Sequence, residues 1–154
     1  MKTVIAGFSH SNNIFSKLIM WMTNSNISHA YVRIDDIVFQ ASGLYVNEEA
    51  YEYFLTFETV VKEIPVQLTD EQFEQSEILR KQSFGKPYSI SEVIGFIWII
   101  FVKKVFNKDV ANPFRDGNKA YVCCKLVADY CHIDDVKENM TPVDLFNILN
   151  KDKS

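Results

Sequence analysis

Cysteine is scarce in this chain, and the few cysteines lack the spacing of a disulfide scaffold or a metal site. The 154 residues include only Cys123, Cys124 and Cys131. Their number is odd, two of them are adjacent, and no C-x-x-C pair occurs. This pattern argues against a disulfide framework, a structural zinc site and a thiol-redox protein. We therefore expect three reduced thiols in a reducing compartment.

A long hydrophobic run and a cleavable leader are also missing. The most apolar stretch, residues 93–102, stops at Lys103, well short of the roughly 20 apolar residues that span a bilayer. The first residues lack the charged start, apolar stretch and small-residue cleavage site of a signal peptide. The sequence therefore predicts a cytoplasmic protein in which residues 93–102 form a buried helix. A helix lying against a membrane surface is the alternative.

The chain is not basic either. Its formal net charge is -4, and Lys103 and Lys104 form a tight basic pair. An acidic surface repels phosphate groups, so the composition gives no general reason to bind nucleic acid or an anionic membrane. The hydrophobic content of 47% and charged content of 23% are typical of a globular protein. The length suits a single domain over residues 1–154.

What the sequence does contain is a series of strand and helix patterns. Strands are predicted over residues 2–8, 29–34 and 37–41, with one or two more within 44–63 that end before Pro65. Ser9 and Ser11 are candidate N-caps for an amphipathic helix over residues 14–22. Further helices are predicted over residues 69–84, 91–106, 122–131 and from 142 onwards, two of them opened by capping signatures. A polar loop is predicted over 107–117, and the chain as a whole indicates an α+β domain.

The first candidate for chemistry lies in the predicted β-hairpin. A two-residue turn at residues 35–36 places Tyr31 opposite Gln40. Opposed residues share a face of the sheet, so His29 lies on the same face as both of them, away from the apolar core side. Gln40 is then a diagonal neighbour of His29. Its carbonyl would accept the imidazole N–H and fix the tautomer, which is the role of the third member of a catalytic triad.

Other interpretations of the histidines stay open at this point. His29 is equally well explained as a surface residue on a half-exposed strand. His10 is predicted in a loop before a helix, where exposure is the simpler interpretation. His132 follows the end of the helix that contains Cys131, and capping explains it.

The second candidate is Cys123, which falls in the first turn of the helix predicted over residues 122–131. Unpaired backbone N–H groups and the helix dipole lower the pKa of a thiol at this position. The same N–H groups would bind the oxyanion that forms when a thiolate attacks a carbonyl. Cys124 is rotated by about 100° around the helix and does not face the same partner. The alternative for any free cysteine is a small buried hydrophobe.

Three segments together resemble a known family. They are Asn-Ile-Ser-His-Ala-Tyr-Val at 26–32, Val-Phe-Gln-Ala at 38–41 and Tyr-Val-Cys-Cys-Lys-Leu-Val at 121–127. Their order is similar to that of the NlpC-type papain-like superfamily, in its circularly permuted branch, where the histidine precedes the cysteine. That branch includes the lecithin:retinol acyltransferase relatives and many bacterial and phage proteins. Here Cys124 and Lys125 replace the usual Ser and Glu, and a one-residue slip would make Cys124 the nucleophile. Gln40 stands where many members carry an acid.

The resemblance implies a permuted papain-like fold and a cysteine hydrolase of the amidase, peptidase, thioesterase or acyltransferase type. Cys123, His29 and Gln40 would form the triad, and Tyr31 or Cys124 would help to bind the substrate or the oxyanion. No metal or cofactor is implied. The expected substrate is a peptide amide or a lipid acyl group, and the oligomeric state stays open. The alternative function is a non-catalytic binding module on the same fold, of phage or mobile-element origin.

Overall fold

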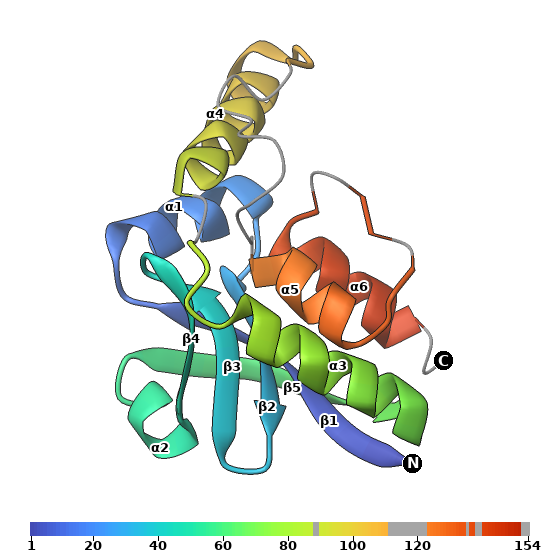
Figure 1. Ribbon diagram of the computed structural model, residues 1–154. Coiled ribbons are helices and arrows are strands. Elements are labelled where there is room, and N and C mark those ends of the chain that lie inside the picture. The colour runs from blue at the N-terminus through green and yellow to red at the C-terminus, as the bar shows by residue number, and fades with distance from the viewer. Residues whose placement is uncertain (88–89, 111–122, 135, 138–139, 152–154) are drawn as a thin grey trace.

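Five antiparallel strands form the centre of the structure, in the order β4-β3-β2-β1-β5 (Figure 1). The computed structural model describes residues 1–87, 90–110, 123–134, 136–137 and 140–151. The strands are β1 (Lys2–Ser11), β2 (His29–Ile34), β3 (Ile37–Ser42), β4 (Tyr45–Ala50) and β5 (Glu58–Leu68). The helices are α1 (Ile14–Thr23), α2 (Tyr51–Phe54), α3 (Asp70–Ser83), α4 (Ile90–Phe106), α5 (Cys123–Tyr130) and α6 (Pro142–Lys151). The predicted α+β class is confirmed, whereas the polar loop predicted over 107–117 lies largely outside the described residues.

The main core lies between one face of the sheet and the helices α3, α5 and α6, which Figure 1 shows in front of the strands. Alternate strand residues point into it, as the period of two in a β-strand requires. The strands contribute Val4, Ala6, Phe8, Ala30, Val32, Phe39 and Ala41, and the helices contribute Leu126, Val127, Tyr130 and Leu145. Because α5 packs directly on β2 and β3, its first residue is carried to the end of β2 where His29 lies.

The predicted register of the β2–β3 hairpin is confirmed. Ile34 pairs with Ile37 and Val32 pairs with Phe39, across a turn at residues 35–36. Asp35 has a φ of 51°, a left-handed conformation that Asp tolerates in turns. The register fixes which side chains of the two strands share a face, and it therefore fixes the relation of His29 to Gln40.

A smaller cluster covers the opposite face of the sheet, where Tyr31 and Val38 pack against Phe54 of the short helix α2. The Tyr31 ring lies directly over Gly7 of β1, so closely that a Cβ at this position would overlap it. Glu63 accepts hydrogen bonds from the Tyr31 hydroxyl at 3.0 Å and from Arg33 at 2.9 Å. The helix α2 was not expected from the sequence.

Two predictions about the ends of elements are wrong. Strand β1 extends to Ser11, so Ser9 and His10 belong to the strand, and the N-cap of α1 is Asn13, whose Oδ1 accepts from Ser16 N at 2.8 Å. Strand β5 continues through Pro65 to Leu68. It lies at the edge of the sheet, where a proline without an N–H is tolerated.

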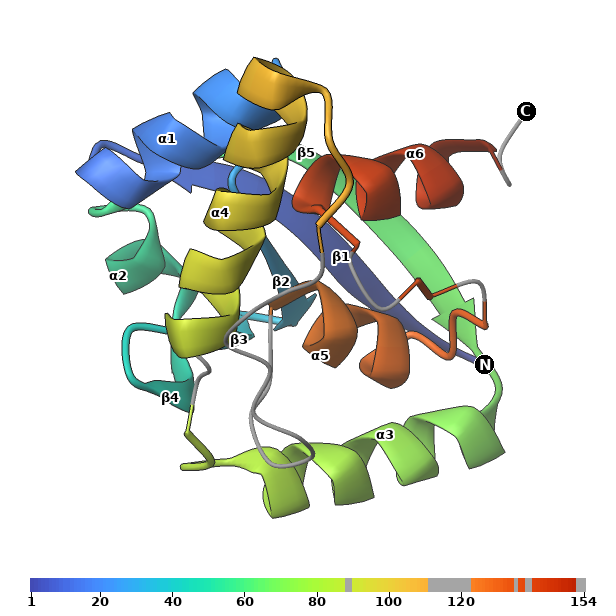
Figure 2. The same cartoon turned by 90° about the horizontal axis from the view of Figure 1, so that it is seen from above.

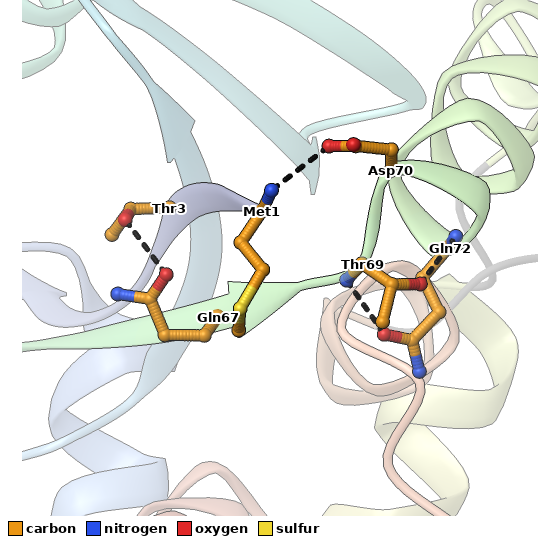
Figure 3. Close-up of polar contacts among 6 residues, drawn as sticks. All are labelled: Met1, Thr3, Gln67, Thr69, Asp70 and Gln72. Atoms are coloured by element: carbon orange, nitrogen blue, oxygen red, sulfur yellow. Dashed lines mark hydrogen bonds and ion pairs between the residues drawn. The ribbon is translucent and has the colours of Figure 1, made fainter.

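The capping predictions for the later helices are confirmed. Thr69 and Gln72 form a capping box in which the Thr69 hydroxyl accepts from Gln72 N at 3.1 Å and Gln72 Oε1 accepts from Thr69 N at 2.9 Å (Figure 3). The N–H of Asp144 donates to the Thr141 hydroxyl at 3.3 Å at the start of α6.

Helix α4 differs from the prediction of a buried helix. Within the predicted range 93–102, Val102 is buried, but Trp98 and Phe101 are exposed. Figure 2 shows α4 beside α1, and Figure 1 shows that α4 projects away from the helices that cover the main core. Among the described residues, no helix is both long and apolar enough to cross a membrane.

Candidate active site

Cys123 is the first residue of α5, at the end of that helix where backbone N–H groups lack partners within the helix. Its side chain is 5% exposed and packs at the edge of the main core. Three groups interact with its sulfur and lower its pKa, namely the thiol of Cys124, the side chain of His29 and the backbone N–H of Ala30. The residues before Cys123 in the motif, at 121 and 122, lie outside the described part of the chain.

The structure brings His29 and Gln40 together as the hairpin register predicts. His29 Nε2 donates to Gln40 Oε1 at 2.7 Å. His29 also interacts with Cys123, and each of the two side chains shifts the pKa of the other. The order thiol, imidazole and amide is that of a cysteine triad.

The electrostatics of the pair favour a thiolate facing an imidazolium. The hydrogen bond from Cys124 is the main cause that holds the pKa of the Cys123 thiol well below its usual range, and His29 adds to it against the effect of burial. Burial lowers the pKa of His29, but the hydrogen bond and charge of Cys123 outweigh it and raise that pKa to about 9. A nucleophile with a lowered pKa beside a protonated histidine is the usual state of an activated cysteine.

Cys124 and Cys131 differ from Cys123 in their surroundings. Cys124 Sγ lies 3.8 Å from Cys123 Sγ, and the hydrogen bond it gives to Cys123 is the first cause that raises its own pKa well above the usual range. Burial alone raises the pKa of Cys131 to about 12. The geometry therefore favours Cys123 over Cys124 as the nucleophile, with Cys124 as a donor to the thiolate.

Glu49 extends the arrangement and was missed by the sequence reasoning. Gln40 Nε2 donates a short hydrogen bond to Glu49 Oε1, which fixes the amide so that its oxygen faces His29. Glu49 lies on β4, where Val38 is its partner in the ladder. Gly43 carried the missing signal, because a two-residue turn at 43–44 pairs Ser42 with Tyr45 and so places Glu49 diagonally across from Gln40.

A second carboxylate, that of Glu58, also acts on the site. Ser9 pairs with His29 across β1 and β2, and its hydroxyl donates to Glu58 Oε2 at 2.8 Å. The charge of Glu58 contributes to the raised pKa of His29. The carboxylates of Glu49 and Glu58 thus both act on the charge of the His29 imidazolium.

Tyr31 does not occupy the predicted place at the oxyanion. Its hydroxyl donates to Glu63, and its fully buried ring packs in the cluster under α2. Tyr31 lies two residues further along β2 than His29, and at this place its hydroxyl is within hydrogen-bond distance of the Glu63 carboxylate. The backbone N–H groups at the start of α5 are the oxyanion donors that the described residues offer.

The other two histidines have structural partners. His10 Nδ1 donates to the carbonyl of Asn26 at 3.0 Å. His132 Nε2 donates to the carbonyl of Gln72 at 3.0 Å, just after the end of α5, which ties that helix end to α3.

No group of three or more histidine, cysteine or acidic side chains in the described part of the chain is arranged to hold a metal ion. Comparison with protein-family models and with curated proteins gives no match to the chain.

Proposed function

We propose that the protein is a cysteine-dependent hydrolase or acyltransferase with a permuted papain-like fold. The observation that carries this proposal is the grouping of Cys123 at the start of α5, His29 interacting with it, and Gln40 hydrogen-bonded to His29. The helix that carries Cys123 lies far along the sequence from the β2–β3 hairpin that carries His29 and Gln40. A histidine or a cysteine that only fills space in the core does not require these partners.

The reaction begins with attack of the Cys123 thiolate on the carbonyl carbon of an amide or ester. A C–S bond forms, and the carbonyl electrons move to the oxygen, which the N–H groups of the first turn of α5 stabilise. The C–N or C–O bond then breaks as the His29 imidazolium gives its proton to the leaving group. Water or another acceptor attacks the resulting thioester, His29 takes its proton, and Cys123 leaves as thiolate.

The substrate proposed is a peptide amide or a lipid acyl group. Neither requires a metal or cofactor for the steps above. The cytoplasm is the proposed location, in keeping with three cysteines that are all unpaired in the structure.

Alkylation at low pH tests the nucleophile. At pH 6 we expect iodoacetamide to modify Cys123 faster than Cys131, read by intact mass and peptide mapping, because the Cys123 pKa is lowered and the Cys131 pKa is raised to about 12. His29→Ala should slow the labelling of Cys123, whereas Cys131→Ala should leave it unchanged. Incubation with a cell lysate should add an acyl mass to the wild type and none to Cys123→Ala.

Two outcomes would overturn the proposal. One is labelling that goes mainly to Cys131, and the other is ordinary thiol reactivity at every cysteine with no acyl adduct. The second outcome is what a non-catalytic binding module on this fold would give.

A further inference from the structure

Helices α1 and α4 pack against each other at one end of the molecule (Figures 1 and 2). The large apolar side chains that they leave exposed are Ile14, Phe15 and Trp21 of α1 and Trp98, Phe101, Val105 and Phe106 of α4. We call this set the α1–α4 surface. Single exposed apolar residues are normal, but a group of this size on two adjacent helices marks a binding surface.

Both tryptophans of the chain lie on the α1–α4 surface. Trp21 is 53% exposed and Trp98 is 50% exposed. Lys104 joins the two helices, with Nζ over the Trp21 ring at 4.4 Å and a hydrogen bond from Nζ to the Trp21 carbonyl at 2.8 Å. Tryptophan with a neighbouring lysine is the combination that settles at the boundary between lipid headgroups and acyl chains.

The charge of this region is opposite to that of the whole chain. Residues 14–23 and 90–110, which cover α1, α4 and the four residues after α4, contain the four lysines Lys17, Lys103, Lys104 and Lys108 and two acidic residues, Glu92 and Asp109. Asp109 pairs with Lys103 at 2.9 Å. The chain as a whole has a net charge of -4, so basic residues are concentrated where the aromatic side chains are exposed. This complements an anionic lipid headgroup, whereas a second copy of this surface would be repelled.

The length of α4 argues for a helix in the plane of the membrane. Its 17 residues extend for about 25 Å, less than the roughly 30 Å of a hydrocarbon core. We propose that the α1–α4 surface binds an anionic lipid membrane, with the exposed side chains of α1 and α4 inserted at headgroup depth.

The surface is tied to the candidate active site but does not depend on its chemistry. Ser16, on the buried side of α1, shares a hydrogen bond of 2.5 Å with Ser28, the residue before His29. A membrane bound to α1 and α4 would therefore lie close to the end of β2 where the triad is formed.

Vesicle binding by the Cys123→Ser protein tests the surface separately from catalysis. We expect the tryptophan fluorescence to shift to shorter wavelength and the protein to sediment with vesicles of phosphatidylcholine and phosphatidylserine. Binding to vesicles of phosphatidylcholine alone should be weaker by about tenfold or more, and so should binding in high salt. Vesicle binding by the Cys123→Ser protein, combined with ordinary thiol reactivity and no acyl adduct in the wild type, would reject only the proposed enzyme function.

Matched variants identify the residues responsible. Lys103→Glu with Lys104→Glu should weaken vesicle binding by about tenfold or more, whereas Lys2→Glu with Lys62→Glu, the same charge change on exposed strand residues, should not. Trp98→Ser should weaken binding, and Phe57→Ser, at another exposed aromatic residue, should leave it unchanged. Equal loss in both lysine pairs, no vesicle binding, or concentration-dependent self-association through Trp98 in place of vesicle binding would overturn the proposal.

Discussion

At the scale of single residues, the neutral amide of Gln40 is hydrogen-bonded to a carboxylate, that of Glu49. An amide alone stabilises an imidazolium less than a carboxylate does. Here Gln40 accepts from His29 while donating to Glu49, so negative charge reaches the imidazole through a polarised amide. Burial raises the pKa of Glu49, and the hydrogen bond from Gln40 opposes this rise. We infer that Glu49 is a positioning residue for the triad.

Glu49→Gln should therefore lower kcat by about tenfold, the loss of one charge-assisted hydrogen bond, with little change in KM. The alkaline limit of the pH profile should also move to lower pH, because the imidazolium is less well stabilised. The rate of acyl-adduct formation across pH measures both effects. Glu48→Gln, at the neighbouring residue on the other face of β4, is the control. An unchanged pH profile for Glu49→Gln would assign this side chain a purely structural role.

The pKa directions at the site also predict how activity depends on pH. The His29 pKa is raised to about 9, so the imidazolium that protonates the leaving group is present at neutral pH and is lost as pH rises through about 9. The Cys123 pKa is lowered, so the thiolate is lost only as pH falls well below the usual range of a thiol. We expect a broad plateau through neutral pH in the rate of acyl-adduct formation. A rate that increases steadily above pH 9 would contradict this assignment of His29.

At the scale of elements, the contact between β1 and β2 depends on a glycine. The Tyr31 ring occupies the space that a side chain at residue 7 would need, and the buried hydroxyl of Tyr31 is anchored by Glu63. The Tyr31 ring packs on the backbone of Gly7, and this contact helps to hold β2, the strand that carries His29, against β1.

Gly7→Ala should destabilise the fold by about 1–3 kcal/mol, because the ring has to move from its packed position. Thermal unfolding followed by circular dichroism measures the loss. In a Tyr31→Leu background the same glycine substitution should cost less, since the overlapping ring is gone. Equal costs in the two backgrounds would show that the Tyr31 ring is not the cause.

The elements also show what the sequence allowed to be predicted. The register of the β2–β3 hairpin next to its turn was predictable, from Ile34 with Ile37 to Val32 with Phe39, because a two-residue turn leaves one register, and Gln40 is hydrogen-bonded to His29 as that register predicts. The predicted strand ends before Pro65, whereas β5 continues to Leu68. A proline is tolerated there because β5 lies at the edge of the sheet, and the order of the strands is not contained in a local sequence pattern. The place of Glu49 depends on the register of β4, which the turn at Gly43 sets.

At the scale of the whole molecule, burial was the hardest property to predict. The apolar run in α4 was interpreted as core, but a hydrophobic pattern alone does not say whether the neighbours on every side are protein. The main core is filled by α3, α5 and α6 instead, and α4 packs beside α1 with Trp98 and Phe106 in solvent. The position of Cys123 was predictable because helix starts and motif order are local signals.

The distance along the chain between His29 and Cys123 has a consequence for synthesis. The strands β1 to β5 leave the ribosome before α5, so the face that receives Leu126, Val127 and Tyr130 stays uncovered until the last part of the chain emerges. The base and its Gln40 partner are therefore made early and the thiol arrives late. A nascent or prematurely terminated chain that ends before α5 lacks Cys123 and therefore lacks the thiol of the proposed triad.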